Sequence, residues 1–169
     1  AVAAHGFIGP RPLGRGMKMD RQAIVGLVAG IRRLGTEHPQ VNLAISLHAP
    51  DDALRRRLVP VPAAPLAEIV SAAEEHVETT GRRVSIEYVL LAGINDAPAQ
   101  AAALGRLLRG LRCHVNLIPI NPSPGVLGQQ PTRTAVLRFQ RALERSGVNT
   151  TVRVEKGRDI AAACGQLRG

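Results

Sequence analysis

A single cysteine near the end of the chain is the residue best suited to nucleophilic chemistry. Cys164 lies in the stretch DIAAACGQLRG, among glycines and alanines that offer little packing volume. Lys156, Arg158 and Arg168 flank it in sequence, and nearby positive charge favours the thiolate form of a cysteine. A catalytic thiolate is one interpretation of Cys164. An ordinary thiol is the alternative, because a lone cysteine is a weak signal.

His48 and Asn121 are polar residues whose positions favour a ligand site. His48 directly follows the apolar segment VNLAISL, so rigid backbone would hold its imidazole. Asn121 lies between Pro119 and Pro122, whose fixed φ angles stiffen the loop and leave the amide free to pair with a ligand. Each residue has a structural alternative, namely a histidine hydrogen-bonded within the fold and a turn-forming asparagine.

Two further candidates lie within predicted strands. Glu87 stands between Ile86 and Tyr88, where an inward carboxylate needs a polar partner. Cys113 begins another apolar run and is most simply a small buried hydrophobe. The two cysteines are far apart and have no CxxC spacing, so the sequence predicts neither a disulfide framework nor a zinc knuckle. This cysteine usage favours a reducing, cytoplasmic compartment.

The elements that must position these residues alternate strictly between helix and strand. Apolar periodicity and terminal signals predict helices over residues 20–34, 65–81, 96–111 and 132–147, and a short capped helix within 50–60. Strands are predicted over 41–49, 83–91, 113–120 and 149–154. This alternation indicates an α/β fold, a parallel sheet with crossover helices. The pattern alone fits both an open sheet and part of a (β/α) barrel, and either gathers polar residues at the carboxyl edge.

The composition limits the number of domains and the kinds of partner. Residues 1–19, rich in Gly, Pro and basic residues, are predicted to be an irregular lead, and 20–169 a single α/β domain. The net charge of +9 comes mostly from arginine, whose planar fork suits phosphate, so RNA is a reasonable partner. A solvated basic surface is the alternative. No apolar run reaches about 18 residues, so we expect no membrane insertion.

Four stretches of the chain together carry a more specific signal. They are LAISLHAPDDALRRRLVPV, GRRVSIEYVLLAGIND, CHVNLIPINPSPG and TVRVEKGRDIAAACGQLRG. In this order and spacing they resemble the carboxyl-terminal part of the RlmN/Cfr family of radical-SAM RNA methyltransferases, with RlmN the closer branch. The likeness runs from about residue 31 to the end. It implies a partial (β/α) barrel of radical-SAM type whose amino-terminal half is missing from this chain.

The resemblance also implies roles for individual residues. Ser46, Leu47 and His48 match a segment that binds S-adenosyl-L-methionine, and Asn121 matches a further contact to that cofactor. Cys164 matches the cysteine that becomes S-methylated during catalysis. The implied reaction is methylation of adenine C2 in 23S rRNA and tRNA by a radical mechanism, and the full-length family also holds a 4Fe–4S cluster.

The chain departs from the family pattern in its cysteines. The cluster motif CxxxCxxC is expected well upstream of residue 31, yet no cysteine precedes Cys113, and the family's upstream glutamate and second cysteine have no counterpart. Because cluster binding needs several thiolates, we expect the isolated chain to be inactive. Three hypotheses follow: the carboxyl-terminal portion of an RlmN-type enzyme, a non-enzymatic RNA-binding remnant, or an α/β scaffold without function.

Overall fold

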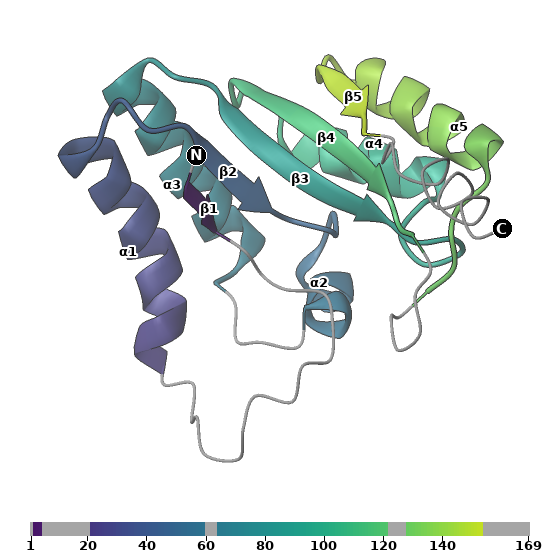
Figure 1. The fold of residues 1–169 in the computed structure, drawn as a ribbon, viewed down its shortest axis with the longest axis horizontal. Helices are drawn as coiled ribbons and strands as arrows, with labels where there is room; N and C mark the ends of the chain where they lie inside the picture. The colour runs from purple at the N-terminus through teal and green to yellow at the C-terminus, as the bar shows by residue number, and fades with distance from the viewer. Residues whose placement is uncertain (1, 5–20, 60–63, 122–127, 154–169) are drawn as a thin grey trace, which may run out of the picture.

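A single parallel sheet forms the centre of the structure. A computed structural model of the chain describes residues 2–4, 21–59, 64–121 and 128–153. The strands pair in sequence order, each parallel to the next, as the arrows in Figure 1 show. They are β1 (Val2–Ala4), β2 (Leu43–Ser46), β3 (Val84–Leu90), β4 (Cys113–Pro119) and β5 (Thr150–Val152). The parallel α/β sheet predicted from the sequence is therefore confirmed.

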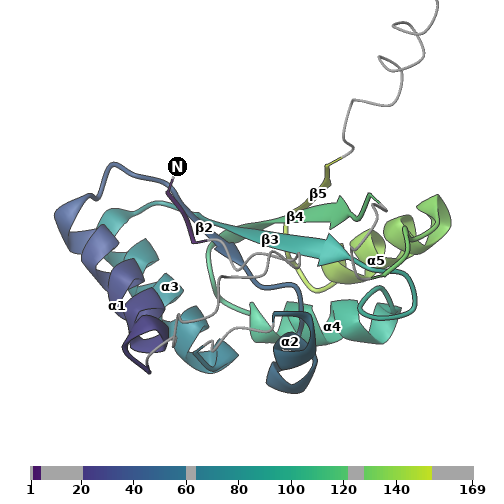
Figure 2. The same cartoon turned by 60° about the horizontal axis from the view of Figure 1, so that its bottom comes forward.

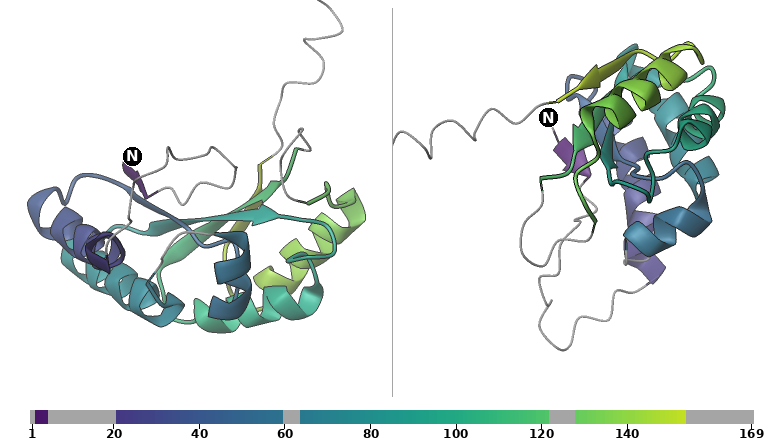
Figure 3. Two further views of the ribbon diagram at one scale, coloured as in Figure 1. Left: turned by 90° about the horizontal axis from the view of Figure 1, so that it is seen from below. Right: turned by 90° about the vertical axis from the view of Figure 1, so that its right-hand side faces the viewer.

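The helices all cover the same face of this sheet. They are α1 (Arg21–Glu37), α2 (Asp52–Leu58), α3 (Leu66–Thr80), α4 (Pro98–Leu107) and α5 (Arg133–Glu144). Figure 2 and the left panel of Figure 3 show these helices on one side of the strands. Sequential strand order with one-sided helices is the geometry of a (β/α) barrel, because a doubly wound sheet carries helices on both faces. The described strands form an arc with β1 and β5 at its edges.

Alternating side chains on the strands build the core on the helical side. In β3, Val84, Ile86, Tyr88 and Leu90 are buried, and the residues between them are only partly buried. The ring of Tyr88 lies 5.3 Å from the ring of Phe139 in α5, measured between centroids. This period of two is the mark of a strand with one face packed against apolar side chains.

The other face of the sheet carries a row of polar side chains. Cross-strand register aligns Ser46 with Glu87, Glu87 with Asn116, and Asn116 with Thr151. Because side chains alternate along each strand, these four residues point away from the helix-covered core. This surface, here called the polar face, is the inner side of the arc in a barrel geometry.

The structure differs from the sequence prediction near the amino terminus. Strand β1 lies inside the lead that was expected to be irregular, and it pairs with β2 in parallel register. The edge of β2 has unpaired backbone N–H and C=O groups, which can bond to any extended segment that lies beside it. Helix α1 ends at Glu37, three residues beyond the predicted end at Leu34, and residue 20, where that predicted helix begins, lies outside the described residues. Within the described part of the chain, no helix has the length and apolarity that crossing a membrane requires.

Candidate functional site

His48 has an unusual backbone conformation directly after β2. Its φ angle is +60°, the left-handed region that residues other than glycine rarely adopt. The Leu47 N–H donates to the Glu87 carbonyl at 3.0 Å, and one step further the His48 Nδ1 accepts from the Val89 N–H at 3.1 Å. Beyond the end of β2, the imidazole of His48 therefore replaces the backbone as the hydrogen-bond partner of β3.

Asn95 holds this conformation from the loop after β3. Its side chain is fully buried and donates from Nδ2 to the carbonyls of His48 at 2.8 Å and Val89 at 2.7 Å. Its Oδ1 accepts from the Leu91 N–H at 2.7 Å, and the Tyr88 hydroxyl donates to its backbone carbonyl at 3.1 Å. Every polar atom of the amide is used to tie two strand ends together, which fixes the carboxyl edge of the sheet.

The environment of His48 keeps its ring neutral. Burial, with a smaller contribution from the charge of Arg55, lowers the pKa of His48 from 6.5 to about 4. Because Nδ1 accepts a hydrogen bond, the ring proton of the neutral form resides on Nε2. His48 is therefore a hydrogen-bond donor near neutral pH and is not suited to exchange protons there.

The polar face contains a carboxylate with one oxygen unsatisfied. Asn116 donates from Nδ2 to Glu87 Oε1 at 2.8 Å, which supplies the polar partner predicted for this residue. Arg153 Nη1 lies 3.7 Å from Glu87 Oε2, beyond hydrogen-bonding distance. Oε2 itself is buried and has no hydrogen-bond partner. A buried carboxylate oxygen without a donor is costly, so this position favours a ligand that brings one.

Comparison with known proteins shows close relatives of a particular kind. No family model matches the chain. A probable dual-specificity RNA methyltransferase RlmN from Roseiflexus sp. (strain RS-1) is 52% identical over 170 residues, which is 95% of this chain and 43% of that protein. The ribosomal RNA large subunit methyltransferase N of Nitrosopumilus maritimus (strain SCM1) is 48% identical, covering 94% of this chain and 45% of that protein.

The chain belongs to the RlmN family. It matches the carboxyl-terminal part of these proteins and spans less than half of their length. A crystal structure of a radical SAM methyltransferase from Sphaerobacter thermophilus superposes with a TM-score of 0.75 and 51% identity, over 83% of this chain and 42% of that one. The fold is thus that of a partial radical-SAM barrel, as the resemblance predicted.

A more distant structure shares the fold alone. A domain of pyruvate-formate lyase-activating enzyme from Bacteroides vulgatus aligns with a TM-score of 0.53 and 17% identity, over 79% of this chain and 92% of that domain. The common architecture at such low identity indicates that strand order and helix placement are retained while side chains change.

The cofactor residues predicted from the RlmN resemblance fall at the carboxyl edge. Ser46 ends β2 on the polar face, and Asn121 follows β4, where the preceding Ile120 N–H donates to the Leu90 carbonyl at 3.0 Å. Leu47 as a whole is 1% exposed within the core, and its N–H is already bonded to the Glu87 carbonyl. Their role in binding S-adenosyl-L-methionine stays a prediction.

The structure describes only one of the two cysteines, Cys113. Cys164, the predicted methyl carrier of the RlmN pattern, lies outside the described residues. Cys113 is partly buried at the start of β4, and burial raises the pKa of its thiol to about 11. It is a protonated packing residue, as the sequence predicted. Within the described residues, no group of three or more His, Cys, Asp or Glu side chains could hold a metal ion.

Sequence reasoning missed two residues of this region, Asn95 and Arg55. Asn95 follows Gly93, whose φ of +69° forms the turn after β3, and an amide just after such a turn is well placed to bond nearby backbone groups. Arg55 lies in α2, whose first turn is capped by Asp51 through a 2.8 Å bond from the Leu54 N–H. Its burial could not be read from a run of three arginines.

Proposed function

We propose that this chain is the cofactor-facing and RNA-facing part of a cytoplasmic RlmN-type methyltransferase acting on adenine C2 of 23S rRNA and tRNA. The observation that carries the proposal is 52% identity to an RlmN protein across 95% of the chain. The polar face and the ordered carboxyl edge support it, because barrel enzymes place their chemistry there.

The residues present fit S-adenosyl-L-methionine, which supplies the methyl group. The unsatisfied Oε2 of Glu87 is an acceptor for the hydroxyl or ammonium donors of that cofactor, and Ser46 lies in register beside it. The Nε2–H of His48 and the exposed amide of Asn121 add a donor and a mixed donor and acceptor at the same edge. These groups would orient the cofactor on the polar face.

The residues present do not fit an iron–sulfur cluster. The chain has two cysteines, Cys113 and Cys164, and clusters of this type need more thiolate ligands. The high pKa of Cys113 also disfavours its thiolate. Cluster ligands would therefore belong to the part of the RlmN proteins that this chain does not match.

Cys164 is proposed to carry the methyl group as a thioether before adenine receives it. Adenine C2 is electron-poor, so direct transfer of a methyl cation to it is unfavourable, and a carrier that delivers carbon by another route is required. The net charge of +9 supports an RNA substrate, since phosphate binding draws on Lys and Arg.

A reconstituted methylation assay tests the proposal. The full-length protein containing this chain would be reduced anaerobically and mixed with labelled S-adenosyl-L-methionine and a 23S rRNA transcript, and the nucleosides would then be analysed. Formation of 2-methyladenosine is expected. RNA binding with a normal salt dependence but no methylated nucleoside would favour the non-enzymatic RNA-binding alternative.

A further inference from the structure

Arg55 is a buried cation that makes no direct ion pair with a carboxylate among the described residues. Arg55 is 5% exposed, and its Nη1 donates to the Ala64 carbonyl at 3.3 Å. Its Nε is buried and has no hydrogen-bond partner. Among the described residues, no carboxylate lies within 4.0 Å of this guanidinium. Burying a charge that lacks a direct ion pair is unfavourable, so the site favours a ligand that brings negative charge.

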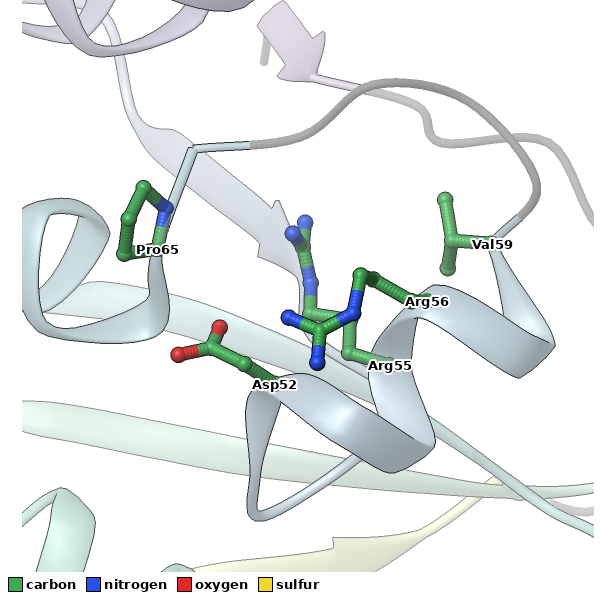
Figure 4. A pocket seen from close by; sticks show the side chains of 5 residues that line it. All are labelled: Asp52, Arg55, Arg56, Val59 and Pro65. Atoms are coloured by element: carbon green, nitrogen blue, oxygen red, sulfur yellow. The ribbon is translucent and has the colours of Figure 1, made fainter.

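A small pocket lies beside this guanidinium. Its volume is about 90 Å³, and it is lined by Asp52, Arg55, Arg56, Val59 and Pro65. Figure 4 shows the Arg55 and Arg56 side chains on the same side of α2, with the Asp52 carboxylate near them. Water occupies about 30 Å³ per molecule in the liquid. The pocket therefore has room for one tetrahedral oxyanion.

The charges around the pocket favour an anion. Two guanidinium groups face one carboxylate, which also accepts at Oδ1 from the Leu66 N–H at 2.9 Å, so the lining carries a net positive charge. Guanidinium groups bind phosphate oxygens through paired N–H donors. The Asp52 carboxylate offsets one of the two positive charges, and a phosphate would satisfy the free Nε of Arg55 and pair with both arginines.

The pocket lies close to the proposed site of chemistry. Helix α2 follows β2 directly, so Arg55 lies seven residues after His48 in the same loop and helix unit. The charge of Arg55 is the smaller of the two causes that lower the pKa of His48, after burial. The pocket therefore lies on the first helix after the carboxyl end of β2, the edge at which the chemistry is proposed.

We infer that the Arg55 and Arg56 pocket binds one backbone phosphate of the RNA substrate and so positions the strand beside the carboxyl edge. This inference rests on the proposed function, because it takes RNA as the substrate. The cofactor's own carboxylate is the other source of an oxyanion near this edge, and the experiment separates the two.

RNA binding over a salt series tests the inference in the full-length protein. A fluorescently labelled 23S rRNA hairpin would be titrated with wild type, Arg55→Gln, Arg56→Gln and Arg57→Gln, and S-adenosyl-L-methionine affinity would be measured separately by equilibrium dialysis. Arg57 is the matched control, because it is exposed on the same helix and does not line the pocket. Arg56→Gln is expected to weaken RNA binding about five- to tenfold at low salt and to reduce the salt slope by about 0.7.

Each outcome decides between the alternatives. Arg55→Gln is expected to reduce the slope at least as much as Arg56→Gln, with Arg57→Gln at the wild-type slope and cofactor affinity unchanged in all variants. If Arg55→Gln does not fold, Arg56→Gln decides alone, since its side chain is exposed. Wild-type slopes for both pocket variants would overturn the inference, and so would a loss confined to cofactor affinity. A wild-type protein that binds no RNA would instead remove the proposed function.

Discussion

The side-chain amide of Asn95 donates to the carbonyl of His48 at 2.8 Å, across 47 residues of sequence. This bond joins the end of β2 to the loop after β3 and stabilises the left-handed conformation of His48. Such a conformation costs of order 1 kcal/mol and persists only where surrounding bonds hold it. The arrangement fixes the carboxyl edge before any ligand binds.

Replacing Asn95 should therefore destabilise the fold strongly. Asn95→Ala removes two donors and one acceptor and leaves the His48 and Val89 carbonyls and the Leu91 N–H unpaired in a buried setting. We expect a loss of about 3 kcal/mol in the free energy of unfolding, measured in urea, because unsatisfied buried groups cost about 1–3 kcal/mol each. Asn149→Ala, which removes an exposed side chain, is the control. Equal stability of the two variants would contradict the structural role.

The neutral ring of His48 should make stability depend on pH. Its pKa is about 4 in the folded protein against 6.5 as the ordinary value, so the unfolded state binds more protons between these limits. The contribution of His48 is complete above pH 6.5 and is lost as pH falls toward 4. Between pH 7.5 and 5 this loss is about 2 kcal/mol.

The variant His48→Asn isolates this effect, since asparagine tolerates the left-handed conformation. Another buried histidine, His76, also has its pKa lowered by burial, but it is present in both proteins and cancels in the difference. Urea unfolding at the two pH values should show a smaller stability loss in His48→Asn than in wild type. An identical pH dependence would mean that the ring is protonated normally in the folded state.

Glu87 should contribute to cofactor affinity more than to stability. Glu87→Gln keeps an acceptor for Asn116 but removes the charge at the unsatisfied oxygen, and the contact with Arg153 is long and exposed. Equilibrium dialysis with S-adenosyl-L-methionine should show about tenfold weaker binding, the loss expected for a hydrogen bond to a charged group. Stability should change by less than about 1 kcal/mol.

The control for Glu87 is Glu74→Gln, which changes an exposed carboxylate on α3. It should bind the cofactor as wild type does. Wild-type affinity of Glu87→Gln itself would remove the polar face from the cofactor site.

Two helical glycines should respond to alanine in opposite directions. A Cβ at Gly105 in α4 would collide with the side chain of Ser146, whereas a Cβ at Gly30 in α1 meets nothing within 4 Å. Alanine raises helix stability by about 1 kcal/mol over glycine, but overpacking costs about 1–3 kcal/mol. Gly105→Ala should therefore lower the melting temperature and Gly30→Ala should raise it. A stabilising Gly105→Ala would show that the turn after α5, which carries Ser146, can shift at little cost.

The sequence predicted the elements well because its signals were local. The apolar positions of β3 alternate over Val84–Leu90, and Pro65 and Gly81 flank α3 as its first and last boundary residues. Neither signal depends on distant parts of the chain. The choice between an open sheet and a barrel was not local, since it depends on which face the helices cover.

The details of the site depended on long-range contacts that periodicity does not encode. Glu87 could be singled out because a carboxylate within an apolar strand is unusual, and its partner Asn116 was found across the sheet. Asn95 and Arg55 carried no such signal, because a loop asparagine and a helical arginine are ordinary on a surface. Only the fold shows that both are buried.

The most direct test of the central claim is the methylation state of 23S rRNA in cells. A bacterial host lacking its own RlmN activity would express the full-length protein containing this chain, as wild type or as Cys164→Ala, and its rRNA nucleosides would be analysed by mass spectrometry. The account predicts 2-methyladenosine with wild type and none with Cys164→Ala, at equal protein levels. The absence of 2-methyladenosine with wild type, or its full retention in Cys164→Ala, would contradict it.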